Sequence, residues 1–189
     1  MNHSDHLDLL RPGISAENGA WADLGSGAGA FTRALAELLG PDGEIYTVDK
    51  DPWALREQKR VLQDVLPGRG DHIRYLNADF TQPLDLPPLD GIVMANALHF
   101  QRRKEPVLQI IRQCLRPGGR LILVEYNTDR GNVWVPYPLS YNTWEVLASR
   151  NGFVHTQLLK VVPSSFLGEI YSALSLKPVE HAESGGGAR

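Results

Sequence analysis

The chain has 189 residues, of which 42% are hydrophobic and 22% charged, so it is long enough for one domain with a substantial core and short for two. Its net charge of −3 argues against a nucleic-acid partner and against an anionic membrane surface. No apolar run approaches the roughly 20 residues of a membrane-spanning helix, no secretory signal opens the chain, and one cysteine, Cys114, predicts a cytoplasmic protein without a disulfide or a metal site.

Strands and helices are predicted to alternate through the first two thirds of the chain. Apolar runs predict strands at 20–24, 44–48, 72–77, 91–95 and 121–124. Apolar residues at helical spacing predict helices at 31–39, 52–66 and 107–115. Pro117-Gly118-Gly119 is expected to break the chain before the last of these strands. The alternation predicts right-handed crossovers and a parallel sheet covered on both faces.

In the last third of the chain, strands and helices no longer alternate. One more helix is predicted around residues 141–148, closed by Asn151-Gly152. Two strands at 153–162 and 169–176 follow without a helix between them, which indicates an antiparallel pair. We therefore predict one domain at 20–178, a short N-terminal segment at 1–19 and a disordered tail at 179–189.

A glycine-rich loop, Gly25-Ser26-Gly27-Ala28-Gly29, lies between the first strand and the first helix. Glycine lets the backbone turn tightly and approach a ligand, and the helix N-terminus attracts a carboxylate or a phosphate. The pattern also fits a dinucleotide fingerprint, Gly25-x-Gly27-x-x-Ala30, and a turn that holds no ligand.

Two acidic residues end the next two strands. Asp49 lies where a carboxylate reaches the ribose hydroxyls of a nucleoside on the glycine loop. Asp79 is suited to accept a hydrogen bond from an adenine amino group, because ionised carboxylates only accept. The alternative for either residue is the capping of a loop.

Five motifs, in this order and spacing, resemble the class I S-adenosylmethionine-dependent methyltransferase family: ADLGSGAGAF, IYTVDKD, NADF, LDGIVMANALHF and LRPGGRLILVE. The resemblance runs from Trp21 to Leu176. It implies an α/β fold with a single doubly wound, Rossmann-like sheet of seven strands, mostly parallel with an antiparallel C-terminal strand. It also implies S-adenosylmethionine as the cofactor.

The resemblance assigns the cofactor contacts by position. It implies that Asp23, Gly25, Gly27 and Gly29 hold the methionine portion, that Asp49 binds the ribose, and that Asp79 and the Phe80 backbone meet the adenine. Further expected contacts within these motifs are Ser26, Lys50 and Asn96.

Candidates for the chemistry follow the fourth strand, because ligands of open α/β sheets gather at the carboxyl ends of the strands. We predict that Asn96 orients the acceptor and that His99 accepts its proton; the alternative is a structural histidine. Methyl transfer is an in-line displacement that works largely by positioning. Asn96–His99 stand where methyltransferases for exocyclic amines carry (Asp/Asn)-Pro-Pro-(Tyr/Phe), so we predict a small-molecule acceptor.

Several alternatives stay open at this stage. The chain is either an active methyltransferase, a binding protein of the same fold without transferase activity, or an NAD-dependent oxidoreductase. Because so short a segment precedes the first strand, a homodimer is a hypothesis for how the site is closed. Aromatic residues after the fifth strand are interpreted either as a pocket wall or as core: Tyr126, Trp134, Tyr137, Tyr141 and Trp144.

Overall fold

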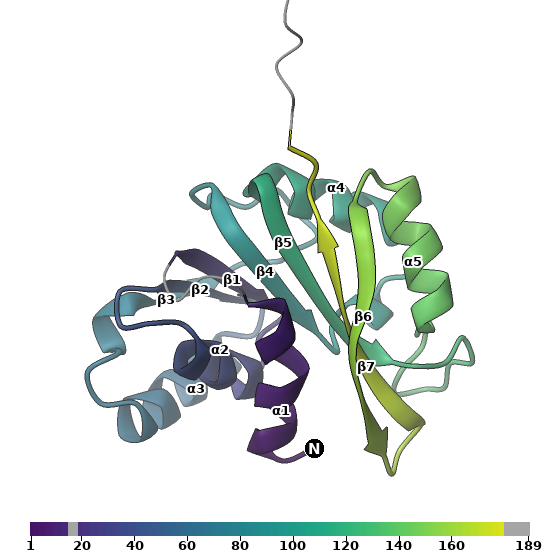
Figure 1. The fold of residues 1–189 in the computed structure, drawn as a ribbon. Helices are drawn as coiled ribbons and strands as arrows, with labels where there is room; N and C mark the ends of the chain where they lie inside the picture. Colours follow the sequence, from purple (N-terminus) through teal and green to yellow (C-terminus); the bar gives the residue numbers. More distant parts are fainter. Residues whose placement is uncertain (15–18, 180–189) are drawn as a thin grey trace, which may run out of the picture.

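The computed structural model has a central sheet of seven strands in the order β3-β2-β1-β4-β5-β7-β6 (Figure 1). The structure describes residues 1–14 and 19–179. The first five strands pair in parallel, whereas β7 lies antiparallel between β5 and β6. The strands are β1 (Ala20–Leu24), β2 (Glu44–Asp49), β3 (Ile73–Asn77), β4 (Leu89–Ala95), β5 (Leu115–Tyr126), β6 (Val154–Ser164) and β7 (Gly168–Leu176). The predicted fold class is confirmed.

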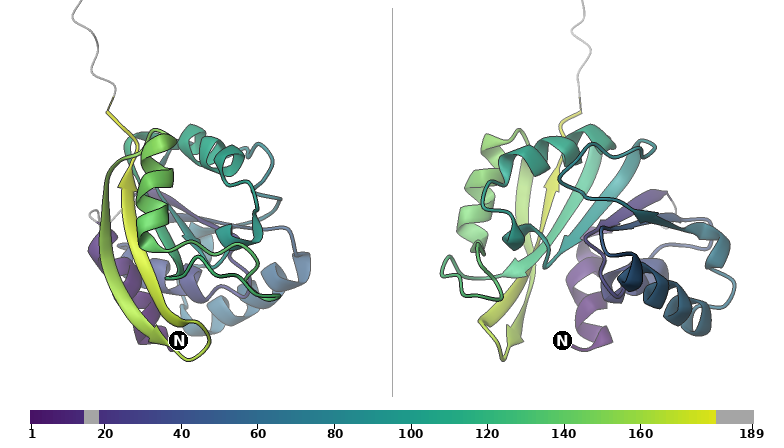
Figure 2. Two further views of the ribbon diagram at one scale, coloured as in Figure 1. Left: turned by 90° about the vertical axis from the view of Figure 1, so that its right-hand side faces the viewer. Right: turned by 180° about the vertical axis from the view of Figure 1, so that it is seen from behind.

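Helices cover both faces of the sheet (Figure 2). They are α1 (His3–Leu10), α2 (Ala30–Leu38), α3 (Pro52–Val65), α4 (Glu105–Cys114) and α5 (Tyr141–Arg150), with short 3₁₀ turns η1 (Arg11–Gly13), η2 (Gly70–His72) and η3 (Leu98–Phe100). α1, α2 and α3 pack on one face, and α4 and α5 pack on the other. Among the described helices, none has the length and apolar character that crossing a membrane requires.

The central strands are largely apolar because both of their faces are buried. In β4, Ile92 and Met94 pack with α4 and α5, whereas Val93 between them packs with α1 and α2. All three side chains are fully buried. The continuous apolar run that predicted this strand therefore reflects two cores, one on each side of the sheet.

Helix α1 was not predicted from the sequence. Asn2 caps it, accepting from the backbone N–H of Asp5, whose carboxylate accepts from Asn2 N–H in return. Leu9 and Leu10 are fully buried against α2 and the sheet. Polar residues predominate in this segment, and they hid the short apolar stripe in the sequence. The predicted tail at 179–189 lies, apart from Val179, outside the described residues.

The predicted break at Pro117-Gly118-Gly119 is wrong as a strand boundary, because β5 runs through these residues. They belong to a bulge, because Leu115 and Arg120 pair with β4 whereas the residues between them do not. Gly118 has a φ of +76° and donates its N–H to the Lys177 carbonyl at 2.9 Å. The proline and glycines predict an irregularity here, but the residue that Gly118 bonds to, Lys177, follows β7 and is distant in the sequence.

The antiparallel pairing of β7 positions the C-terminal hairpin. Tyr126, the last residue of β5, pairs with Ile170 near the start of β7. The turn between β6 and β7, which contains Phe166, therefore lies at the edge of the sheet where β5 ends (Figure 1). The carboxyl ends of β1, β2, β3 and β4 lie along the same edge, since these strands are parallel to β5.

Candidate cofactor and active site

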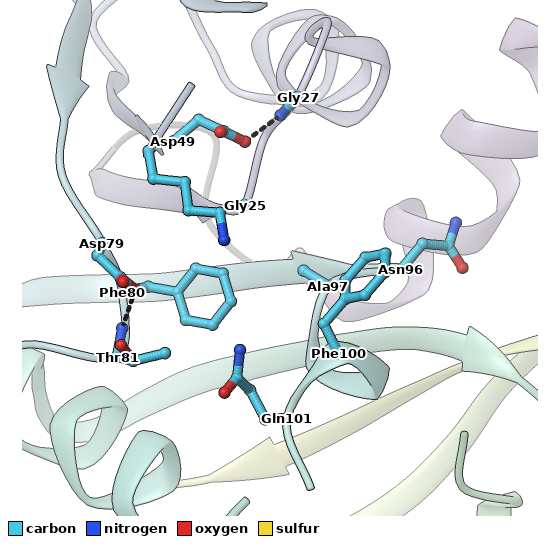
Figure 3. Close-up of a pocket in the computed structure, with 11 residues that line it drawn as sticks. Gly25, Gly27, Asp49, Asp79, Phe80, Thr81, Asn96, Ala97, Phe100 and Gln101 are labelled. Carbon is cyan, nitrogen blue, oxygen red and sulfur yellow. Dashed lines mark hydrogen bonds between the residues drawn. The ribbon is translucent and has the colours of Figure 1, made fainter. Parts of the chain in front are cut away.

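A cavity of about 580 Å³ opens at the carboxyl ends of the parallel strands (Figure 3). Its lining residues follow β1, β2, β3 and β4: Gly25, Gly27, Asp49, Lys50, Asp79, Phe80, Thr81, Asn96, Ala97, Phe100 and Gln101. Seven of the predicted site residues are brought together here. Four others lie outside the lining, namely Asp23, Ser26, Gly29 and His99.

The backbone of the glycine loop lies directly against this cavity. Gly25, Gly27 and Gly29 have φ angles of +76°, +52° and +85°, the left-handed region that favours glycine. A Cβ on Gly25 would stand 2.6 Å from the Cβ of Ala97, whereas one on Gly27 would meet no protein atom within 4 Å. Gly25 therefore has no room for a side chain, whereas the backbone at Gly27 faces the open space of the cavity.

Gly25→Ala should lower the thermal unfolding midpoint clearly more than Gly27→Ala does. Both substitutions carry the backbone cost of an L-residue at positive φ, about 1–2 kcal/mol, but only the first forces its methyl group into Ala97. Calorimetric melting of the two variants measures the difference. Equal midpoints would show that the contact with Ala97 yields at no cost.

Asp49 joins the end of β2 to the glycine loop. One carboxylate oxygen accepts the backbone N–H of Gly27 at 2.8 Å (Figure 3) and the other accepts the backbone N–H of Asp51 at 2.8 Å. Each carboxylate oxygen can accept a second hydrogen bond. Asp49 is therefore held rigidly and can still bind two neighbouring hydroxyl groups.

Asp79 lies across the cavity, after β3. Its carboxylate accepts the backbone N–H of Thr81 at 2.9 Å (Figure 3), and this hydrogen bond holds the pKa of Asp79 below its usual value. The group is consequently ionised at neutral pH and can only accept. Such a carboxylate suits a ligand amino group at this end of the cavity.

Asp23 lies behind the glycine loop and is 1% exposed. Its carboxyl oxygen is 2.6 Å from the Thr32 hydroxyl. Burial raises the pKa of Asp23 to about 7, against the opposing effect of the Thr32 hydrogen bond, and the negative charge of Asp49 raises it further. Asp23 does not line the cavity, so any contribution to ligand binding passes through the loop.

Asn96 ends β4 with a left-handed backbone, φ +50°, which asparagine tolerates better than most residues. Its N–H donates to the Val124 carbonyl at 2.8 Å. Within residues 1–14 and 19–179, its carboxamide oxygen is buried and has no hydrogen-bond partner. The oxygen has almost no exposed surface, so Asn96 lines the cavity through its other atoms.

His99 lies in η3 beneath Phe100 and is 3% exposed. Its Nδ1 is 2.8 Å from one carboxylate oxygen of Glu125, and its backbone N–H donates to the other at 3.0 Å. An ionised carboxylate only accepts, so Nδ1 carries the proton and Nε2 carries the lone pair. The Phe100 ring, which lines the cavity, lies 4.3 Å from the imidazole. His99 therefore lies next to the cavity, in contact with Phe100 but outside the lining.

Glu125, which is fully buried near the end of β5, was not predicted as a site residue. The available signal was an acid directly after the apolar run Leu121–Val124. Four lining residues were also not predicted, although each follows a predicted site residue by only one or two positions: Thr81, Ala97, Phe100 and Gln101.

The glycine cradle, the fixed carboxylate of Asp49 and the acceptor at Asp79 fit an adenosine cofactor with an amino-acid end. A family model described as "Methyltransferase domain" matches residues 22–121, more than half of the chain. The chain belongs to the class I S-adenosylmethionine-dependent methyltransferases. S-adenosylmethionine is the cofactor that this family assignment implies.

Two relatives show how far the similarity to individual proteins extends. The methyltransferase is 30% identical over 160 residues to a reducing polyketide synthase, grgA, from Penicillium sp, covering 70% of this chain and 6% of that one. It is 30% identical over 107 residues to the ubiquinone/menaquinone biosynthesis C-methyltransferase UbiE of Hahella chejuensis, covering 56% of this chain and 42% of that one. The chain therefore spans less than half of either relative.

A solved structure shares the fold. The N-methyltransferase NodS from Bradyrhizobium japonicum, in complex with S-adenosyl-L-homocysteine, superimposes with a TM-score of 0.74. The match covers 93% of the methyltransferase and 86% of NodS, at 20% sequence identity. At this identity the likeness extends to the fold alone.

Proposed function

We propose that the protein methylates a carbon atom of a small, largely apolar acceptor, with His99 as the general base and Glu125 as its orienting partner. The observation that carries the proposal is the buried pair of His99 and Glu125, 2.8 Å apart and adjacent to the cavity. The bound cofactor supplies a methyl group activated by its sulfonium, which the acceptor takes by in-line displacement.

Different residues of the cavity contact different parts of the cofactor. Gly25 and Gly27 offer backbone to the methionine portion, and Asn96 lines the cavity at the end of β4. Asp49 accepts from the ribose hydroxyls, and Asp79 with the adjoining Phe80 meets the adenine. The remaining predicted contacts are Lys50, which lines the cavity, Asp23 behind the glycine loop, and Ser26 and Gly29 within the loop but outside the lining.

His99 removes the acceptor proton, and Glu125 orients His99 for this step. The Glu125 carboxylate holds Nδ1–H, which leaves the lone pair of Nε2 to take a proton from the acceptor. The imidazolium that results stays paired with a buried carboxylate, which stabilises its charge. A transfer to an amine that is already nucleophilic would not need this base, so the pair favours an acceptor that must lose a proton.

Aromatic rings surround the base. Phe100 is 57% exposed at the cavity, and the ring of Tyr126 lies 6.2 Å from His99. Phe166, 49% exposed in the turn between β6 and β7, lies 5.9 Å from Tyr126. These rings suit an apolar acceptor with one acidic position. The name of the Hahella chejuensis relative, a C-methyltransferase, supports carbon over oxygen as that position.

Incubation of the protein with S-adenosylmethionine and defined acceptors tests the proposal. The panel comprises two compounds that can accept a methyl group on carbon, 1,4-dihydroxynaphthalene and 1,3-cyclohexanedione, with a catechol as oxygen acceptor and an aniline as nitrogen acceptor. Mass spectrometry quantifies S-adenosylhomocysteine, and nuclear magnetic resonance locates the new methyl group. We expect methylation on carbon; methyl groups found only on nitrogen or oxygen would contradict the proposal.

A further inference from the structure

A glutamine interrupts the buried stripe of α3. The buried residues of this helix are Leu55, Gln58 and Leu62, and Gln58 is 0% exposed. Placing a carboxamide in a core is costly unless its polar atoms are hydrogen-bonded. An apolar residue would serve the packing of α3 equally well, so the contacts of Gln58 indicate what else it does.

The carboxamide of Gln58 joins three parts of the structure. Its Nε2 donates to the hydroxyls of Thr32 in α2, at 2.6 Å, and Thr47 in β2, at 2.8 Å. Its Oε1 accepts the hydroxyl of Ser26 in the glycine loop at 3.3 Å. Through Gln58, these hydrogen bonds connect the glycine loop to α2 and β2.

The stem of Gln58 also supports the loop by contact. A Cβ on Gly29 would lie 2.4 Å from the Cγ of Gln58, so the backbone of Gly29 rests on this side chain. Thr32, which receives a hydrogen bond from Gln58, directs its own hydroxyl to Asp23. Gln58 therefore contacts the loop at Ser26 and at Gly29, and it also orients the group that holds Asp23.

We infer that Gln58 is a positioning residue, which holds the Ser26–Gly29 segment in the shape that binds the amino-acid end of the cofactor. Gln58 does not line the cavity, so it acts through the loop. The adenosine end depends on other contacts, because Asp49 is fixed by the backbone N–H of Asp51 as well as by that of Gly27. Loss of Gln58 should consequently weaken ligands that carry the amino-acid end and spare those without it.

The inference rests on the cofactor assignment and is independent of the acceptor. It is tested by calorimetric titration of Gln58→Met with S-adenosylhomocysteine and with 5′-methylthioadenosine, which lacks the amino-acid end. Methionine keeps the length of the side chain and removes its hydrogen bonds. We expect the Kd for S-adenosylhomocysteine to rise about tenfold or more, and the Kd for methylthioadenosine to stay within about twofold.

Gln63→Met is the matched control, since Gln63 is exposed on the same helix; neither Kd should change. Should Gln58→Met fail to fold, Ser26→Ala removes a single bond of the network and must show the same selective weakening, by about threefold. An equal rise of both Kd values would reduce Gln58 to a general stabiliser of the domain. An unchanged affinity for S-adenosylhomocysteine would likewise overturn the inference.

Discussion

Glu125→Gln should slow methyl transfer by about 10²–10⁴-fold, the range expected when a general base loses its function. Glutamine keeps the shape of the side chain, but its amide cannot stabilise an imidazolium as a carboxylate does. Glu125 contacts His99 and does not line the cofactor cavity. The affinity for S-adenosylmethionine should therefore stay within about twofold of the wild-type value.

Turnover is measured with the acceptor that the panel yields, and cofactor affinity is measured by calorimetry on the same preparations. Glu145→Gln, on the exposed side of α5, is the matched control and should retain wild-type turnover. His99→Gln should lose as much activity as Glu125→Gln, because the two residues act as one unit. Wild-type turnover in a folded Glu125→Gln variant would remove His99 and Glu125 from the chemistry.

Asp23→Asn should become more stable relative to the wild type as the pH rises. The pKa of Asp23 is about 7 in the folded protein, against an ordinary value of 3.8. The unfolded chain therefore releases this proton at a lower pH than the folded chain does. Above pH 4 the wild type loses stability progressively until the pH passes 7, and asparagine, which does not ionise, removes this loss.

Urea unfolding without cofactor, at pH 5 and at pH 8, measures the effect. The unfolding free energy of Asp23→Asn minus that of the wild type should increase by about 2–3 kcal/mol between the two pH values. Comparing variant with wild type cancels the groups that titrate in both. A difference that does not change with pH would show that Asp23 ionises as freely in the folded protein as in the unfolded one.

Much of the fold could be predicted because the central strands are buried on both faces. Their apolar runs and the glycines or prolines between them give the order of elements, and β1 occurs at the predicted residues. Helix α1 could not be predicted in this way, because only Leu9 and Leu10 of its eight residues are fully buried. The bulge before Arg120 depends on Lys177, which is distant in sequence.

The residues of the candidate site likewise fall into those that a local sequence pattern reveals and those that only the tertiary structure brings together. Gly25, Gly27, Asp49 and Asp79 were identified because each lies at or just after the end of a strand, where the parallel topology gathers ligand-binding groups. Glu125 acquires a role only when the pairing of β4 with β5 brings it beside His99. Gln58 was overlooked because helical periodicity identifies a buried position without revealing what a polar side chain contacts there. A homodimer and a cytoplasmic location stay predictions from the sequence.

Calorimetric titration of the protein with S-adenosylmethionine, S-adenosylhomocysteine and NAD, repeated on Asp49→Ala, tests the cofactor site most directly. Asp42→Ala, an exposed acid in the turn before β2, serves as the control. We expect the protein and the control to bind the first two ligands and not NAD. In Asp49→Ala their affinity should fall by about 30-fold or more, since the charged acceptor for the ribose and the anchor of Gly27 are both lost. Binding of NAD alone, or undiminished affinity in Asp49→Ala, would contradict this account.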